Sequence, residues 1–386
     1  VAAGMVGQAS GDTGPLAGLR VIDMATLVAG PGAARYLGDF GADVIKVESP
    51  AGDSARTLGL AASPDEDSYY WKFLGRNKRS IVIDLKSDEG SARFRRMIGR
   101  ADVLVENLRV GKLEVLGLGP DVLAELNPSL VVLRVSGFGQ SGPYATRPGF
   151  ATLVEAMSGY ASISGEPDGP PLLPPTSLSD DIAALAGAFA VMVALWERER
   201  SGLGQVIDVN LLESIVQLLG PLILAFRDVG YLQPRLGSGI PYSVPRGTYR
   251  TADGEYIAVS ASANRVASRL LELLGVADDP RFTTHTARIE HRTEIDALLQ
   301  GWIGDRIAVD VLAEFERVDA AAARVNSVAD LVSDSHIVAR DALIDVDGYT
   351  MQGLVAGFSR TPGAIRFAGR VLGSDTLEFD DWLGDS

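Results

Sequence analysis

The sequence predicts an α/β protein with a parallel β-sheet in a large domain and a smaller second domain. Up to about residue 210, short apolar segments typical of buried strands alternate with helical patterns. A glycine-rich turn, Gly30-Pro31-Gly32, links the first of these strands to a helix. Because repeated strand–helix units place their strands in parallel, we expect a Rossmann-like sheet that binds ligands at the carboxyl ends of its strands.

Each predicted strand is a short segment that contains Val, Ile or Leu. The predicted strands are residues 19–24, 43–48, 81–85, 103–106, 130–135 and 204–209. The predicted helices are residues 30–41, 88–100, 121–126, 151–159, 182–200 and 210–224. The helix that ends near residue 200 is followed by Ser201-Gly202, and glycine is the usual stop signal.

The first strand–turn–helix unit matches a dinucleotide-binding fingerprint only in part. Gly30 and Gly32 supply two of its three glycines, and Glu48 closes the second strand at the expected distance. Arg35 stands where the third glycine belongs, and Pro31 occupies the turn. The sequence therefore disfavours a nicotinamide or flavin site, although the helix N-terminus could still receive a phosphate.

The sequence pattern changes near Tyr231. Residues 249–260 predict a β-hairpin with an Asp253-Gly254 turn, and helical patterns follow at 264–274, 290–303 and 308–317. The predicted domains are a disordered tail at residues 1–15, a large domain at 16–227, a small α+β domain at 228–330, and a segment at 331–386 that returns to the large domain.

Composition excludes several classes of function. The chain has no Cys, which removes disulfides, thiolate catalysis and cysteine zinc sites, and its three His residues do not form a close metal-ligand pattern, so no metal is expected. The formal charge of −15 disfavours a nucleic acid partner. No apolar run of membrane-spanning length is free of Gly, Pro and charge, and the first 15 residues lack the features of a signal peptide. We expect a cytoplasmic protein with no membrane partner.

The pair Asp180-Asp181 opens the long apolar helix and is the most informative local feature. Asp180 is predicted as the N-cap of this helix, because a carboxylate accepts the free N–H groups of the first turn. It could also be a nucleophile, and the two roles are compatible. The positive end of the helix is expected to lower the pKa of Asp180 and keep it ionised.

Other polar segments follow the predicted strands. The basic run Arg76, Lys78 and Arg79 predicts a solvated turn or, beside the glycine-rich turn, a source of cations for phosphates. Residues 136–150 are rich in glycine but lack the lysine and the spacing of a P-loop, which favours a flexible active-site loop. Asn107 and Gly137 lie just past strand ends, where ligands are expected.

Five segments in order along the chain together resemble the family III CoA-transferases, also called the CaiB/BaiF family, which includes formyl-CoA transferase and carnitine CoA-transferase. The segments are residues 16–48, 77–90, 101–107, 126–143 and 178–209, and a weaker likeness continues to about residue 376. The resemblance implies the fold of that family, in which two ring-shaped chains interlock as a homodimer. It also implies that the large domain binds coenzyme A.

The resemblance implies an enzyme that moves CoA from an acyl-CoA donor to a small carboxylic acid. The family's catalytic aspartate corresponds to Asp180. Its carboxylate would form a mixed anhydride with the acyl group and then an aspartyl-CoA thioester. The CoA thioester is a substrate, and no permanently bound cofactor is implied.

The resemblance also assigns CoA contacts by position. They are Leu27 and Ala29 in the first turn, Ile83, Asp84, Leu85 and Lys86 around the adenosine part, and Asn107, Leu108 and Arg109 after the fourth strand. Backbone N–H groups of the segment from Gly137 to Gln140 are candidates to hold developing negative charge. Ser49 and Val115 stand where formyl-CoA transferase has arginines, so the phosphates are expected to use other cations, such as Arg76, Lys78 or Arg109.

The sequence predicts substrates that differ from those of formyl-CoA transferase. Formyl-CoA transferase has a glycine-rich lid, and the corresponding segment of this sequence, Gly237-Ser238-Gly239, is shorter than that lid. This difference disfavours oxalate as the acceptor. The segment at residues 147–159 instead resembles family members that act on dicarboxylic acyl groups such as succinyl-CoA.

One alternative within the superfamily is α-methylacyl-CoA racemase. That reaction needs a second proton-transfer group, a His in the segment at residues 148–151, and no His occurs between residues 1 and 284. A non-catalytic CoA-binding protein and a nicotinamide oxidoreductase are the remaining alternatives. The intact Asp180 argues against the former, and tight NAD(P) binding would identify the latter.

Overall fold

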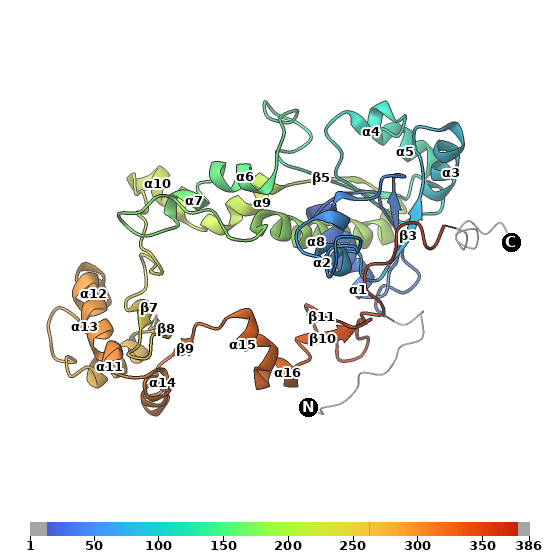
Figure 1. The fold of residues 1–386 in the computed structure, drawn as a ribbon. Coiled ribbons are helices and arrows are strands. Elements are labelled where there is room, and N and C mark those ends of the chain that lie inside the picture. Colours follow the sequence, from blue (N-terminus) through green and yellow to red (C-terminus); the bar gives the residue numbers. More distant parts are fainter. Residues whose placement is uncertain (1–13, 262, 377–386) are drawn as a thin grey trace. The chain divides into compact units, whose positions relative to one another are not determined.

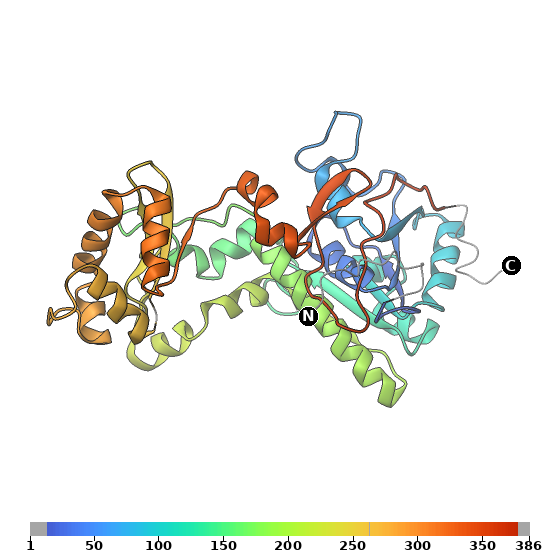
Figure 2. The same ribbon diagram turned by 90° about the horizontal axis from the view of Figure 1, so that it is seen from below.

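The computed structural model describes residues 14–261 and 263–376, which form two compact units (Figures 1 and 2). The large unit contains the described residues up to 158, together with 174–219 and those from 338 onward. The small unit contains residues 159–173 and 220–337. The predicted disordered tail lies outside the described residues, except for Gly14 and Pro15.

The large unit is built on one six-stranded sheet in which every pair of neighbouring strands is parallel. Its strand order is β3-β2-β1-β4-β5-β6, which confirms the predicted α/β class and the Rossmann-like sheet. The strands are β1 (Arg20–Asp23), β2 (Asp43–Glu48), β3 (Lys78–Val82), β4 (Val103–Glu106), β5 (Val131–Ser136) and β6 (Val206–Asn210).

Helices cover both faces of this sheet, because alternate side chains of each strand enter different apolar clusters. Val21 and Val103 pack with α1 and α8 on one face, whereas Ile22 and Leu104 pack with α3 and α5 on the other. The helices of the large unit are α1 (Ala29–Asp39), α2 (Tyr69–Leu74), α3 (Asp88–Ile98), α4 (Lys112–Val115), α5 (Pro120–Leu126), α6 (Ala151–Met157), α8 (Leu178–Ser201) and α9 (Leu211–Val216), with 3-10 turns η1 (Ser54–Thr57) and η2 (Gln217–Leu219).

The third strand begins earlier than predicted, and this places the basic run in the protein interior. Lys78 and Arg79 belong to β3, and Arg76 and Lys78 are each only 1% exposed. Arg76 pairs with Asp39 at 2.6 Å and Lys78 with Asp23 at 2.8 Å. The interpretation as a solvated turn is therefore wrong. Arg76 and Lys78 are also unsuited to bind phosphates, since their charges are already paired.

The helix that carries Asp180 begins earlier than the sequence suggested. Helix α8 starts at Leu178 with Ser177 at the N-cap position, so Asp180 and Asp181 lie within its first turn. The N-cap prediction for Asp180 is therefore wrong. Among the described helices, α8 is long and apolar enough to cross a membrane, but a core helix passes the same test, and several of its residues pack in the core on α1.

The C-terminal residues of the large unit form a β-hairpin, and an extended segment then runs along the edge of the sheet. The hairpin consists of β10 (Leu343–Val346) and β11 (Tyr349–Gln352). In Figure 1 the red segment that follows runs beside β3, where the Asp375 carboxylate accepts the Ser80 N–H at 2.8 Å. The sequence did not predict this hairpin, because its strands are short and contain polar residues.

The small unit is a helical cluster on an antiparallel sheet of β7 (Arg246–Arg250), β8 (Tyr256–Ser260) and β9 (Ala322–Arg324). The predicted hairpin is present, whereas β9 was missed. The predicted helix 210–224 is interrupted at Gly220-Pro221, between η2 and α10. The remaining helices are α7 (Tyr160–Ile163), α10 (Leu222–Val229), α11 (Asn264–Leu273), α12 (His285–Glu290), α13 (Arg292–Gly304), α14 (Ala308–Arg317) and α15 (Val328–Ser333), and α16 (Ser335–Ala339) spans the junction with the large unit.

The contact between α1 and α8 depends on a glycine and can be tested by adding one methyl group. A Cβ atom at Gly32 would lie 2.8 Å from the Ala184 Cβ atom, whereas a Cβ atom at Gly301 in α13 meets nothing within 4 Å. Both Gly→Ala substitutions share the helix-propensity gain. We therefore expect Gly32→Ala to lower the free energy of unfolding of the large unit, relative to wild type, by roughly 1–3 kcal/mol more than Gly301→Ala lowers that of the small unit, which is the usual cost of overpacking.

The measurement is calorimetric unfolding of each variant, with the transitions of the two units resolved. If the two substitutions changed the free energy of unfolding of their own units equally, relative to wild type, tight packing between α1 and α8 would be contradicted.

Candidate active site

One cavity of the large unit, which we call the main cavity because Asp180 is in its wall, lies where the strand order of the sheet reverses. Strands β1 and β4 are neighbours, but the chain continues from β1 to β2 on one side and from β4 to β5 on the other. Such a reversal leaves a crevice outside the carboxyl ends of the two strands. The turn at residues 24–28 follows β1, and the loop at residues 107–111 follows β4.

This main cavity has a volume of about 620 Å³ and contains most of the predicted site residues in its wall. Asp180 reaches it from the first turn of α8. The other predicted residues in its wall are Leu27, Ala29, Asn107, Leu108, Arg109 and Gly137. Residues from the ends of β1, β4 and β5 are therefore brought together with the candidate nucleophile.

A second, smaller cavity of about 260 Å³ adjoins the first. Its wall contains the remaining predicted contacts for the adenosine part of CoA, which are Ile83, Asp84, Leu85 and Lys86. Thr26 and Leu108 are in the walls of both cavities. The turn after β1 and the loop after β4 thus separate two spaces that an elongated ligand could occupy together.

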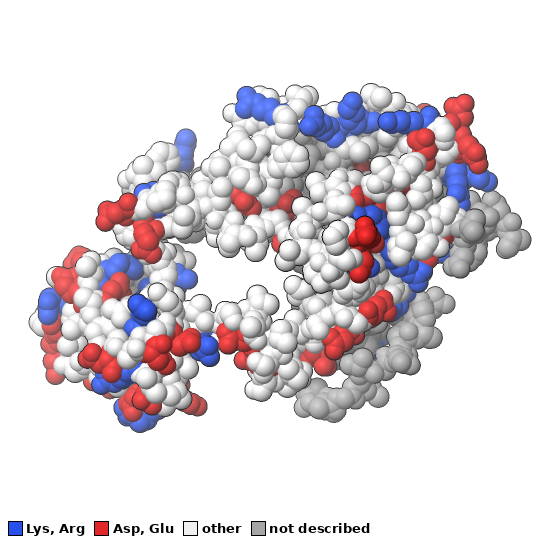
Figure 3. Space-filling view, viewed as in Figure 1, with Lys and Arg blue, Asp and Glu red and all other residues white. Residues whose placement is uncertain are grey.

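Basic side chains gather around the main cavity although the chain as a whole is acidic. In Figure 3, Lys and Arg form a row along the upper edge of the large unit, over the segments that lead to α4 and α6 in Figure 1. Arg109, Lys112 and Arg147 are in the wall of the main cavity, and Lys86 is in that of the smaller one. This local charge suits an anionic ligand in a protein whose net charge would otherwise repel it.

The Asp180 carboxyl group is half-buried and has two acidic neighbours. Glu155 of α6 is 3% exposed, and its Oε1 atom accepts the Ser179 N–H and the Ser179 hydroxyl, both at 3.1 Å. Burial, followed by the charges of Asp181 and Glu155, raises the pKa of Asp180 to about 7. The sequence predicted the opposite direction, because it considered the helix dipole without the surrounding protein.

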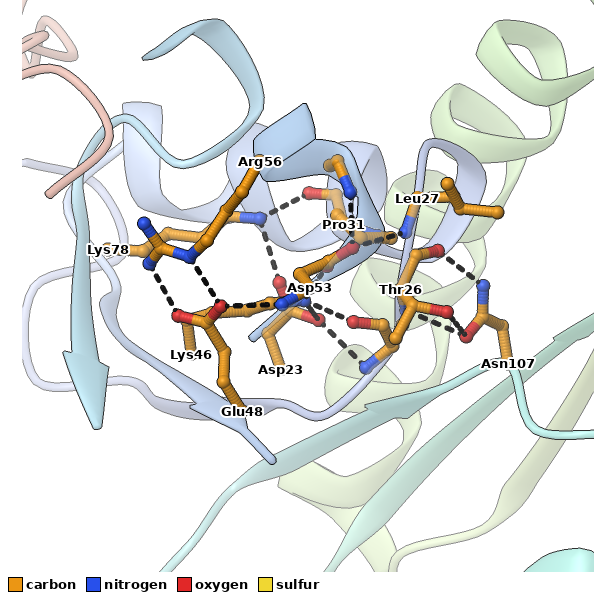
Figure 4. Close-up of polar contacts among 12 residues, drawn as sticks. Asp23, Thr26, Leu27, Pro31, Lys46, Glu48, Asp53, Arg56, Lys78 and Asn107 are labelled. Atoms are coloured by element: carbon orange, nitrogen blue, oxygen red, sulfur yellow. Dashed lines mark hydrogen bonds and ion pairs between the residues drawn. The ribbon is translucent and has the colours of Figure 1, made fainter. Parts of the chain in front are cut away.

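Two side chains hold the turn after β1 on opposite sides (Figure 4). The Asn107 side-chain amide accepts the Thr26 N–H at 2.8 Å and donates to the Thr26 carbonyl at 2.7 Å. The Asp53 carboxylate accepts the Leu27 N–H at 3.0 Å. The polar atoms of Asn107 are therefore used inside the protein, and Asn107 shapes the cavity by fixing the backbone of Thr26. No sequence pattern indicated Asp53, which lies in a predicted polar loop.

In the segment after β5, the backbone amides of Gly139 and Gln140 already have hydrogen-bond partners. The Gly139 N–H donates to the Ser136 hydroxyl at 2.9 Å, and the Gln140 N–H donates to the Asp208 carboxylate at 2.7 Å. These amides are already bonded, and Gln140 is in the wall of neither cavity. We therefore no longer expect Gln140 to hold developing charge. Gly137 is required for close packing, since its Cβ would lie 2.5 Å from the Gly149 Cα.

Several residues of the cavity wall were not singled out from the sequence. Tyr70, Ser177 and Leu211 line the main cavity together with Thr146. Two of them could have been found from their place in the sequence. Ser177 lies shortly before Asp180, and Leu211 follows the end of a predicted strand. Within residues 14–261 and 263–376, no group of three or more Asp, Glu or His side chains is arranged to hold a metal ion.

Comparison with known proteins identifies the family. The model of CoA-transferase family III matches residues 16–376. The chain belongs to this family. It is 39% identical to the succinyl-CoA–D-citramalate CoA-transferase of Chloroflexus aurantiacus, over 96% of this chain and 94% of that protein. It is 36% identical to the succinate–glutarate CoA-transferase of Agrobacterium fabrum, over 90% of this chain and 88% of that protein.

Solved structures of the family have the same fold as this CoA-transferase. A CaiB/BaiF family protein from Brucella suis superimposes with a TM-score of 0.87 at 32% identity, covering 96% of this chain and 100% of that one. The resemblance inferred from the five sequence segments is confirmed. CoA-transferases act on CoA thioesters, so the two adjoining cavities are the natural candidates for the CoA site.

Proposed function

We propose that this CoA-transferase moves CoA from an acyl-CoA donor to a carboxylic acid acceptor, with Asp180 as the covalent nucleophile. The observation that carries the proposal is the position of Asp180 in the wall of the main cavity, beside the turn after β1 and the loop after β4. Parallel sheets bind their ligands at this point, and a carboxylate there can reach a thioester whose CoA part lies along the two loops.

The reaction balances without a redox cofactor or a metal. An Asp180 carboxylate oxygen attacks the thioester carbonyl, the C–S bond breaks, and a mixed anhydride and CoA thiolate form. The thiolate then attacks the aspartyl carbonyl carbon, which gives an aspartyl-CoA thioester and releases the donor's acid as a carboxylate. The acceptor carboxylate repeats these steps in reverse order, and each covalent intermediate divides one difficult exchange into easier steps.

The environment of Asp180 suits this role. A carboxylate with a pKa of about 7 is a stronger base than an ordinary one, and it is still about half ionised at neutral pH. Partial burial also removes part of the hydration shell that would otherwise shield the attacking oxygen. The cations Arg109 and Lys112 in the same wall can offset the negative charge of an approaching CoA ester.

We propose succinyl-CoA as the donor and a short dicarboxylic acid as the acceptor. The relatives named above act, by their names, on succinyl-CoA or succinate with citramalate or glutarate. Arg147 supports this choice, because it lies in the wall of the main cavity and can bind the free carboxylate of such an acyl group. Its guanidinium stacks over the Tyr144 ring with the Cζ atom 3.9 Å from the ring centroid, which holds it in place.

We also propose a cytoplasmic homodimer, the assembly that the family resemblance implies. Large apolar side chains are exposed on α8, among them Phe189 and Trp196, which are each 71% exposed. Leu224 and Val229 are exposed on α10. Exposed apolar surface of this extent is typical of an interface between chains.

Asp180→Ala tests the nucleophile directly. After incubation with succinyl-CoA and rapid quenching, mass spectrometry of the wild-type protein should find CoA attached to the peptide that contains Asp180. The variant should lack this adduct, and its turnover should fall by roughly 10³-fold or more, because removal of a covalent nucleophile abolishes the whole pathway.

Asp181→Ala is the matched control, and it should retain the adduct on Asp180. An adduct on Asp181, or undiminished turnover of Asp180→Ala, would refute the assignment. Exchange of the α-proton without any adduct would favour the racemase alternative.

The pH dependence of kcat/KM provides a second test. Only the ionised Asp180 carboxylate is nucleophilic, so kcat/KM should rise with pH up to about 7 and level off above it. Glu155→Gln removes one negative neighbour but keeps an oxygen that can accept from Ser179. The pKa of Asp180 should therefore fall, and the acid limb of the profile should move to lower pH.

The control is Glu197→Gln near the other end of α8, where no shift is expected. An acid limb in Glu155→Gln that stays in place or moves to higher pH would contradict this account of the Asp180 pKa.

A further inference from the structure

Beyond the Met24 N–H, which donates to the Val105 carbonyl at 3.0 Å, the turn after β1 is held mainly by side chains (Figure 4). Asn107 binds both polar backbone groups of Thr26. The Asp23 carboxylate accepts the Ala25 N–H at 3.1 Å, and the Lys46 ammonium donates to the Ala25 carbonyl. Asp53 accepts the Leu27 N–H. These bonds replace the sheet and helix hydrogen bonds that the turn lacks.

Leu27 makes this support necessary. Its φ angle is 64°, in the left-handed region that residues other than glycine rarely adopt. Such a conformation persists only where the surroundings determine it. Because Leu27 is in the wall of the main cavity and Thr26 is in the walls of both cavities, the conformation of this turn sets the shape of both spaces.

Asp53 is the buried group that fixes the Leu27 end of the turn. It is 4% exposed, its Oδ1 atom accepts from Leu27 and from Ala55, and its Oδ2 atom lies 2.8 Å from the Lys46 ammonium. Its own N–H donates to Glu48 at 2.9 Å. Asp53 and Lys46 are at the wall of the smaller cavity, but their side chains are each only 1% exposed. They therefore act on a ligand through the turn.

We propose that Asp53 is a positioning residue for CoA binding, which holds the left-handed turn at Leu27 in the shape that lines both cavities. Lys46 fixes the carboxylate of Asp53 by their ion pair, so that its other oxygen faces the Leu27 N–H. This inference rests on the proposed function, since it takes the two cavities to be the CoA site.

Asp53→Asn and Asp39→Asn form a matched pair of variants. Asp39 is also a buried aspartate of the large unit, 1% exposed and paired with Arg76, but it is in the wall of neither cavity. Both substitutions remove a buried negative charge and should lower the melting temperature. Only Asp53→Asn places a side-chain NH₂ group in conflict with either the Lys46 ammonium or the Leu27 N–H.

The readouts are the Kd for free CoA by titration calorimetry and the kinetic constants with succinyl-CoA. Asp53→Asn should raise the Kd and the KM by about tenfold, the factor expected when a left-handed residue loses its support, with a smaller change in kcat. Asp39→Asn should leave the Kd within twofold. Asp53→Glu, which keeps the charge but displaces the carboxylate by one methylene group, should also weaken CoA binding.

Leu27→Gly separates positioning from general stability. Glycine adopts a positive φ angle at no steric cost, so Asp53→Asn should raise the Kd less in the Leu27→Gly background than in the wild-type background. Equal Kd values for the wild type, Asp53→Asn and Asp53→Glu would overturn the inference and leave the proposed function standing. Equal weakening by Asp39→Asn would also overturn it, by showing a loss of stability alone. A wild-type protein that does not bind CoA would overturn both proposals.

Discussion

The buried ion pairs around Asp23 are the interaction on which the large unit depends. Lys46 and Lys78 reach the Asp23 carboxylate from β2 and β3, at 3.6 and 2.8 Å, and Lys78 also donates to the Pro31 carbonyl of α1 at 2.6 Å. A buried charge is tolerable only when it is paired and hydrogen-bonded, so these contacts must all form together. They join three strands and the start of α1 at the edge of the sheet where the cavities open.

The two lysines respond differently to this environment. Burial would lower the pKa of Lys46, but Asp23 and Asp53 outweigh it and raise that pKa. Burial and the nearby charges of Lys46 and Arg35 lower the pKa of Lys78 to about 8, although Asp23 opposes them. Lys46 is therefore the more firmly charged of the two, and it is the one that holds the Asp53 carboxylate against the turn after β1.

Features that depend on local sequence patterns were predicted correctly, whereas features that depend on contacts between distant residues were missed. Apolar runs located five strands of the sheet closely and placed the third about three residues too late, and ordered motifs identified the family. The run at Arg76 and Lys78 was misread because consecutive charges usually mark the surface, and the acidic partners Asp39 and Asp23 lie far away in sequence. The pKa of Asp180 was misjudged for a similar reason, since Glu155 belongs to a different helix.

The position of the candidate nucleophile and the shape of the cavity depend on one continuous piece of structure. Helix α1 begins at Ala29, directly after the turn that Asp53 and Asn107 hold. Its Gly32 allows α8 to approach closely at Ala184, one turn of helix beyond Asp180. A change in the turn would therefore shift α1, and α8 with it. Packed helices therefore fix the position of the proposed CoA-binding loops relative to the carboxylate proposed to attack the thioester, and they hold such a geometry more closely than loops can.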